Sequence, residues 1–157
     1  MNKINTRIRD LVYVTQEKWA KNIIDIGKAH AENRDLKDLM FNLLNNIYAF
    51  EISEVLFKPT LAKNQQFRST KEEFISYFLG NNKVCDEDRG FAVKKWKSIK
   101  FDNYKILAQR DFIISMGNYF FENQEKSVLK VEYTFGFIRV NPDELRINLH
   151  HSSLPCK

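Results

Sequence analysis

The last apolar run of the chain ends in four residues whose side chains can do acid–base and hydrogen-bond chemistry. The stretch reads RINLHHSSLPCK and contains His150, His151, Ser152 and Ser153. An imidazole titrates near neutral pH and can act as a general base, and a hydroxyl can donate to an oxygen on which negative charge develops. Whether any of these groups share a site depends on the direction in which each side chain points.

Side chains on a β-strand point alternately to its two faces. Apolar and polar residues alternate from Leu145 to Leu149, which marks the apolar positions as the inward face. Continuing the alternation predicts that His151 and Ser153 face inward and that the other histidine and serine face outward. A β-bulge would reverse this assignment. The alternative to a site is a set of polar groups at the end of a strand, hydrogen-bonded to the backbone.

A metal centre is not expected from these residues. The chain has one further histidine, His30, in a predicted helix, and adjacent histidines on a strand point apart, so a three-histidine zinc site is disfavoured. Cys85 and Cys156 lie far apart and match no metal or redox spacing, so we expect two reduced thiols in a cytoplasmic protein. No cofactor is predicted.

Length and composition indicate one globular domain spanning residues 1–157. The chain has 13 phenylalanines but only 5 glycines and 3 prolines, and its apolar stretches are too short to cross a bilayer. The polar start MNKINTRIRD lacks the apolar region of a signal peptide, so secretion is not expected. The net charge is +5, yet basic and acidic residues are interspersed, which disfavours a nucleic-acid partner.

Helical patterns occupy the first third of the chain. Thr15 is placed to cap a helix whose apolar residues recur at three- and four-residue steps from Trp19 to Ala29, and a second amphipathic helix is predicted over residues 36–47. EVLFKPTLA is typical of a strand that Pro59 confines to a sheet edge. In STKEEFISYFLG, Ser69 and Glu72 form a capping-box pattern that begins a short helix ending near Gly80.

The remainder of the chain reads as strands. The segments WKSIKF, KILAQRDFIISMGNYFF, VLKVEYTFGFIRV and ELRINLHHSS are rich in β-branched and aromatic residues, and the turn over residues 141–144 joins the last two into an antiparallel hairpin. Helices followed by a meander of strands predict an α+β fold, with N-terminal helices packed on a strongly curved antiparallel sheet. Such a cone would enclose a pocket.

Several motifs resemble one protein family. LFKPTLA, SYFLG, EDRGFAVKKW, MGNYFF, KVEYTFGFIRV and LRINLHHSSLP are together similar to the association domain of calcium/calmodulin-dependent protein kinase II, within the nuclear transport factor 2-like superfamily. The subgroup that ends in HHSSLP contains the iota-class carbonic anhydrases. The resemblance runs from about Trp19 to Pro155, although Cys156 stands where the family usually has a tyrosine.

The resemblance implies reversible hydration of carbon dioxide to bicarbonate, without a metal, in a pocket of hydroxyl and imidazole groups. The family's KPT threonine matches Thr60, and the tyrosine before its FLG-like turn matches Tyr77. Its terminal histidine and serine match His151 and Ser153 best, in agreement with the alternation. His151 is then the general-base candidate, and the hydroxyls of the other three residues would bind the substrate and donate to its oxygens.

Two other functions remain open. The chain could be a non-catalytic oligomerisation or small-molecule-binding module, since Tyr133, Phe135 and Phe137 could form an exposed sheet face that pairs two copies; a homodimer is expected in either case. It could also be an isomerase or hydrolase, because the superfamily supports many chemistries on one fold. That reading calls for a pocket carboxylate, for which Glu51, Glu54 and Glu132 are available.

Overall fold

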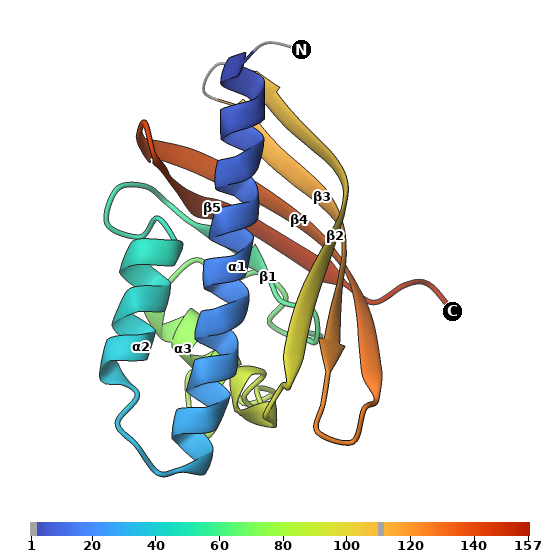
Figure 1. The fold of residues 1–157 in the computed structure, drawn as a ribbon. Helices are drawn as coiled ribbons and strands as arrows, with labels where there is room; N and C mark the ends of the chain where they lie inside the picture. The colour runs from blue at the N-terminus through green and yellow to red at the C-terminus, as the bar shows by residue number, and fades with distance from the viewer. Residues whose placement is uncertain (1–2, 110–111) are drawn as a thin grey trace.

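A computed structural model describes residues 3–109 and 112–157 as a group of helices packed on a five-stranded sheet (Figure 1). The helical elements are α1 (Lys3–Ala31), α2 (Lys37–Asn42), the π-helix η1 (Leu43–Ile47), α3 (Lys71–Leu79) and the 3₁₀ turn η2 (Ala92–Lys94). The strands are β1 (Leu56–Lys58), β2 (Ser98–Gln109), β3 (Phe112–Glu122), β4 (Val128–Asn141) and β5 (Glu144–Ser153). The predicted α+β order, helices first and strands afterwards, is confirmed.

The sheet has the strand order β1-β5-β4-β3-β2. The four long strands form an antiparallel meander, as predicted, but β1 pairs with β5 in parallel, so the sheet is mixed at this edge. The short β1 ends immediately before Pro59, which agrees with the expected edge position because proline has no N–H to donate to a further strand. Through this pairing β1 lies directly beside the histidines, with Phe57 opposite His150 and Lys58 opposite His151.

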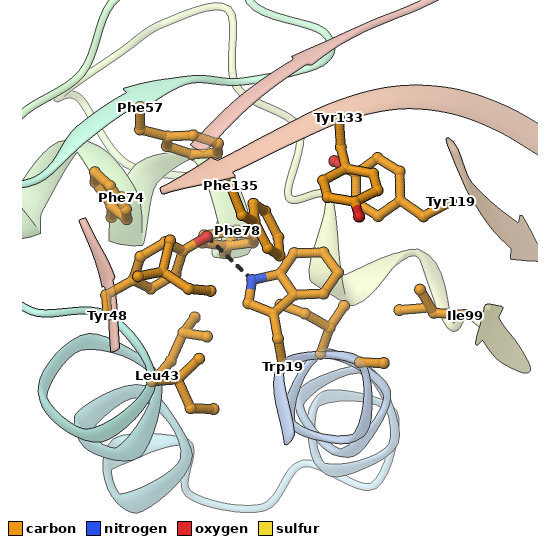
Figure 2. Close-up of a cluster of buried hydrophobic side chains, with 14 of the residues drawn as sticks. Trp19, Leu43, Tyr48, Phe57, Phe74, Phe78, Ile99, Tyr119, Tyr133 and Phe135 are labelled. Carbon is orange, nitrogen blue, oxygen red and sulfur yellow. Dashed lines mark hydrogen bonds between the residues drawn. The ribbon is translucent and has the colours of Figure 1, made fainter. Parts of the chain in front are cut away.

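Helix α1 crosses the inner face of the sheet and brings Trp19 to the centre of the core (Figures 1 and 2). The indole is almost fully buried and lies edge-on to Phe78, Phe121 and Phe135. Aromatic rings thus fill the space between helices and sheet, which accounts for the high phenylalanine content. Edge-to-face ring pairs add stabilisation of about 0.5–1.5 kcal/mol each beyond the area that they bury.

The helix starts differ in detail from the sequence predictions. Helix α1 begins at Lys3, so Thr15 lies in its interior and its hydroxyl donates to the Leu11 carbonyl at 2.8 Å; the predicted cap at Thr15 is wrong. The capping box of α3 is formed one residue later than predicted, by Thr70 and Glu73. Gly80 ends α3 at a φ of 68°, a backbone conformation that glycine adopts without strain.

The second predicted helix is confirmed, and its last turn has an unusual geometry. Residues 43–47 form a π-helix, after which Tyr48 becomes extended and forms a parallel bridge with Ile147 of β5. The extra residue per turn in a π-segment shifts the direction of the side chains that follow it. Tyr48 is fully buried and points into the core (Figure 2).

The strand predictions locate the sheet but misplace one boundary and one face. WKSIKF and KILAQ belong to a single strand, β2, and the connection to β3 falls at residues 110–111, outside the described residues. Tyr133, Phe135 and Phe137 are buried on the inner face of β4, so the prediction that they form an exposed face is wrong. Within residues 3–109 and 112–157, no helix combines the length and apolar character needed to span a membrane.

Candidate active site

A β-bulge in β5 reverses the predicted directions of the terminal histidines and serines. Gly136 of β4 pairs with Leu149 and the next residue, Phe137, pairs with Ile147, so Asn148 is an extra residue without a partner on β4. The alternation of burial is regular up to Ile147, skips one position, and then resumes at His150. A bulge adds one residue to one strand and therefore moves every later side chain to the opposite face.

Gly136 is the residue that allows the bulge to form. A Cβ atom placed on it would lie 2.9 Å from the Leu149 Cβ and 3.2 Å from the Asn148 Oδ1. A glycine in the interior of an otherwise regular strand often marks a bulge or a close backbone approach. This signal is present in the sequence VLKVEYTFGFIRV, but the alternation-based prediction did not use it.

His150 and Ser152 therefore face the core, and His151 and Ser153 face outward. His150 and Ser152 are buried to 2% and 1% exposure, whereas His151 is exposed. Ser153 donates to a Glu132 carboxylate oxygen at 2.9 Å on the outer face. The predicted inward direction of His151 and Ser153 is wrong, because the prediction assumed an uninterrupted strand.

The imidazole of His150 has polar partners on both of its nitrogens. Nδ1 lies 2.7 Å from the Tyr48 hydroxyl, and Nε2 lies 2.8 Å from the Ser152 hydroxyl and 3.1 Å from the Tyr119 hydroxyl. Tyr119 and Ser152 are also hydrogen-bonded to each other. On the far side of Tyr48, the Trp19 indole N–H donates to the Tyr48 oxygen at 3.0 Å (Figure 2). These contacts join α1, the end of η1, β3 and β5 at a single point.

Aromatic rings enclose this imidazole and keep it away from water. The Phe57 ring stacks on it at 4.7 Å and the Phe135 ring meets it edge-on at 4.4 Å. Burial disfavours the charged form and lowers the pKa of His150 well below its usual value near 6.5, with a further lowering from the nearby His151. The imidazole is therefore neutral at physiological pH.

Thr60 and Tyr77 come to the same cluster from the loop after β1 and from α3. Both are buried, and burial raises the pKa values of Tyr77 and Tyr119; the Thr60 hydroxyl partly offsets this for both tyrosines, and the Leu61 backbone does so for Tyr77. The Tyr77 hydroxyl lies beside Thr60 without reaching hydrogen-bond geometry. Among the described residues it is the one fully buried side-chain polar atom that has no hydrogen-bond partner.

Charged residues hold the loop that carries Thr60. The Glu87 carboxylate accepts hydrogen bonds from three consecutive backbone N–H groups, at residues 63–65, with distances between 2.8 and 3.2 Å. At the end of the loop, Arg68 is buried and forms a bidentate ion pair with Asp88 at 2.8 and 3.0 Å. Asp88 also accepts a hydrogen bond from Ser76 of α3, at 2.6 Å, so the loop and the helix that carries Tyr77 are linked.

Tyr77 also lines a small cavity that leads toward this cluster from the segment between α3 and η2. The cavity has a volume of about 80 Å³, and two cationic and two anionic side chains stand at its walls: Arg89, Lys94, Glu87 and Asp88. Both carboxylates already have partners, Asp88 in Arg68 and Glu87 in the backbone N–H groups of residues 63–65. The cavity is of the size that a molecule of a few atoms requires.

The described residues form no metal site at this cluster. Across the part of the chain that the structure describes, no three residues of the types His, Cys, Asp and Glu are grouped as a metal site would require. Glu51, Glu54 and Glu132 are exposed and lie outside the buried cluster, although Glu54 and Glu132 each line one of the two hollows on the outer face of the sheet.

Two members of the cluster, Tyr48 and Tyr119, were missed from the sequence. Both are surrounded by apolar residues, a pattern typical of core packing, and nothing local distinguishes them from the other tyrosines. Tyr119 does lie within MGNYFF, a motif of the family resemblance, but it was not assigned a role. The place of Tyr48 in the cluster follows only from the three-dimensional structure, in which η1 brings it beside β5.

Comparison with known proteins shows the family to which the chain belongs. The model of the family described as metal-independent carbonic anhydrase matches residues 10–154. A metal-independent carbonic anhydrase from Nostoc sp. (strain PCC 7120 / SAG 25.82 / UTEX 2576) is 32% identical over 152 residues, which cover 92% of this chain and 72% of that protein.

Solved structures show the same fold. The crystal structure of a cyanobacterial iota-carbonic anhydrase in complex with bicarbonate matches with a TM-score of 0.87 and 29% identity, covering 94% of this chain and 92% of the other. A protein of the nuclear transport factor 2-like family from Streptomyces avermitilis matches with a TM-score of 0.57 and 14% identity, covering 94% and 96%, and supports the fold alone. By its sequence match over nearly its whole length, the chain belongs to the metal-independent carbonic anhydrase family.

Proposed function

We propose that this protein catalyses the reversible hydration of carbon dioxide to bicarbonate, and that the reaction takes place at the cluster of Thr60, Tyr77, Tyr119, His150 and Ser152. The observation that carries the proposal is the unpaired hydroxyl of Tyr77. A buried hydroxyl without a partner costs about 1–3 kcal/mol. A bicarbonate oxygen beside Tyr77 and Thr60 would accept this hydrogen bond and recover the cost.

The charge state of the cluster suits an anion of this kind. Burial raises the pKa of Tyr77 and Tyr119 and lowers that of His150, so all three are neutral near pH 7. Neutral donors in a site shielded from water stabilise negative charge without a permanent countercharge. During hydration a water oxygen bonds to the carbon of carbon dioxide, one C=O π bond breaks and leaves negative charge on its oxygen, and the water proton passes to a buffer base or to bulk water. Donors aimed at those oxygens lower the barrier.

The surroundings of the cluster suit the other substrate. Carbon dioxide is small and apolar, and the rings of Phe57, Phe78 and Phe135 form an apolar wall beside the polar cluster. In the reverse direction, Arg89 and Lys94 at the small cavity would attract bicarbonate toward Tyr77, because the two carboxylates at the same walls, Glu87 and Asp88, are already bonded to the loop backbone and to Arg68. An apolar wall and a cationic approach therefore serve the two substrates separately.

The proposal has a direct test. Stopped-flow hydration of carbon dioxide should exceed the buffer rate, and bicarbonate should raise the temperature of thermal unfolding because it binds the folded state. A protein that gave neither effect would be a non-catalytic module, and the proposed function would be wrong. Chloride at equal ionic strength controls for a general effect of salt.

We also propose that a second copy of the chain covers the outer face of the sheet. An outer-face patch of apolar side chains, comprising Leu56, Tyr104, Phe112, Met116 and Leu149, surrounds hollows of about 690 and 580 Å³. Leu56, Phe112 and Met116 are 60%, 54% and 52% exposed. A large exposed apolar patch on a folded domain commonly marks an interaction surface.

His151 and Ser153 line the 580 Å³ hollow, and their outward direction supports a role in the proposed interface. Light scattering should give the mass of a dimer at micromolar concentration. The paired substitution Phe112→Lys and Met116→Lys should shift the protein toward the monomer. A monomeric wild-type protein would contradict the interface.

A further inference from the structure

We infer that Trp19 and Tyr48 fix the tautomer of His150, with its single proton on Nε2, so that the imidazole acts as a hydrogen-bond donor toward the site and not as the base that deprotonates water. The tautomer follows from the contacts alone. The donor role toward substrate rests, in addition, on the proposed function.

The argument begins at the indole of Trp19. An indole N–H can only donate a hydrogen bond, and it lies 3.0 Å from the Tyr48 oxygen in the interior of the core (Figure 2). The Tyr48 oxygen is therefore the acceptor in this contact. Trp19 is 1% exposed and Tyr48 is fully buried, so water does not compete for either group.

The proton of the Tyr48 hydroxyl must then point elsewhere. Within the described residues, the other partner of this hydroxyl is His150 Nδ1, at 2.7 Å. If Nδ1 carried a proton, the Tyr48 oxygen would receive two donors while its own hydrogen pointed into apolar surroundings. An unpaired buried donor costs about 1–3 kcal/mol, so the arrangement in which Tyr48 donates to a bare Nδ1 is favoured.

A neutral imidazole has one proton, and with Nδ1 bare that proton is on Nε2. The rings of Phe57, Phe135 and Trp19 surround the imidazole and oppose its conversion to the imidazolium cation. The neighbouring His151 adds to this effect of burial on the pKa of His150. Among the described residues, the polar partners of the ring are three hydroxyls, of Tyr48, Tyr119 and Ser152, and include no carboxylate that would stabilise the charged form.

The hydrogen bonds therefore run in one direction. Trp19 donates to Tyr48, Tyr48 donates to His150, and His150 Nε2–H donates toward Ser152 at 2.8 Å and Tyr119 at 3.1 Å. A chain of donors that all point one way needs an acceptor at its end. A bicarbonate oxygen is such an acceptor, whereas a water molecule that must lose its proton to Nε2 is not served by a nitrogen that already carries one.

Trp19 and Tyr48 are positioning residues in this scheme, since neither contacts the substrate. Their effect is to exclude the tautomer with a bare Nε2. The imidazole then neither gains nor loses a proton during turnover, and the proton released from the attacking water passes to a buffer base or to bulk water.

Nuclear magnetic resonance reads the tautomer without any reference to activity. In protein labelled with ¹⁵N at its histidines, long-range ¹H–¹⁵N correlation distinguishes a protonated ring nitrogen from a bare one. His30→Ala and His151→Ala variants assign the two exposed histidines and leave the signal of His150. We expect a protonated Nε2 and a bare Nδ1 at pH 7. A protonated Nδ1 with a bare Nε2, or an imidazolium, would overturn the inference.

Tyr48→Phe tests the source of the preference, with Tyr133→Phe as the matched control. Both substitutions remove one hydroxyl from a buried ring, but the Tyr133 hydroxyl bonds Gln16, at 2.8 Å, and not His150. Tyr48→Phe should give a mixture of His150 tautomers and a roughly two- to tenfold lower kcat, the range expected when one hydrogen bond is lost. Tyr133→Phe should leave the tautomer unchanged. An unchanged tautomer in Tyr48→Phe would show that Tyr48 does not fix the tautomer of His150.

Different results would refute the proposed function and the tautomer assignment of His150. A wild-type protein with a protonated Nε2 but no hydration of carbon dioxide would retain the tautomer assignment and lose the proposed function. An active protein whose Nε2 is bare would retain the function and make His150 the base.

Discussion

The Nε2 atom of His150 lies 2.8 Å from the hydroxyl oxygen of Ser152, and both side chains point to the buried face of β5. The two residues are separated by one position, as the alternation of a strand requires. The same spacing relates His151 and Ser153, which point to the outer face. The bulge at Asn148 decides which of the two pairs enters the core.

Replacing Ser152 by alanine should lower kcat/KM for hydration about ten- to a hundredfold. The substitution removes a hydroxyl that contacts both His150 and Tyr119 at the proposed site, and leaves partners unpaired at a cost of about 1–3 kcal/mol. Ser153→Ala is the matched control, since it removes the same group from the outer face and should leave the rate within twofold. Equal losses in both variants would contradict the assignment of faces.

Tyr77→Phe should separate activity from stability. The Tyr77 hydroxyl has no partner at hydrogen-bond geometry in the described structure, and its looser contacts are with Thr60 and the Leu61 backbone, so its removal should leave the free energy of unfolding nearly unchanged. The same variant should lose hydration activity about ten- to a hundredfold and should lose the stabilisation that bicarbonate gives to the wild type. Denaturant unfolding with and without bicarbonate measures both. A strongly destabilised variant would show that the hydroxyl already has a partner.

Stability should depend on pH below about 6.5 through His150. Its folded-state pKa is lowered, mainly by burial, so the unfolded chain takes up a proton at this position first as the pH falls. The stability is complete above the unfolded pKa and decreases as the pH falls toward the folded pKa, with a slope of at most about 1.4 kcal/mol per pH unit.

A His150→Gln variant is the reference for this slope, and urea unfolding between pH 7 and 5 provides the measurement. Glu73 and Glu87 have lowered folded-state pKa values, so their own contributions are lost nearer the ordinary glutamate range, and they are present in both proteins. The wild type should therefore lose more stability than the variant in this window. Parallel curves would show that the buried imidazole titrates normally.

Much of the fold could be predicted from the sequence because it follows from local patterns. The apolar spacing from Trp19 to Ala29 predicted the helix that covers the sheet, and the turn over residues 141–144 predicted the hairpin of β4 and β5. The start of α1 could not be predicted from its capping signal, because Thr15 bonds to the preceding turn within the helix. Parallel pairing of β1 with β5 joins residues about ninety positions apart, which no local pattern reports.

The candidate site was predictable in part. The family motifs pointed to Thr60 and Tyr77, which the structure places together, and to the terminal histidine–serine pair. Strand alternation then predicted the wrong side-chain direction for both members of the pair, because it contains no information on where a strand gains a residue. Gly136, a glycine in a strand interior and opposite the bulge, was the sequence signal that could have predicted it. Tyr48 depends on the π-helix and on a distant strand, so its place beside His150 could not be read from its neighbours in sequence.

The most direct test of the proposed site is the rate of carbon dioxide hydration by chelator-treated protein, measured by stopped flow for the wild type, His150→Ala and His151→Ala. A metal-independent reaction at the buried face predicts that the chelator leaves the wild-type rate unchanged. It also predicts that His150→Ala loses about a hundredfold or more, since a donor to the substrate and the support of Ser152 disappear together, while His151→Ala stays within about twofold. Loss of wild-type activity in the chelator, or a larger loss in His151→Ala than in His150→Ala, would contradict the account.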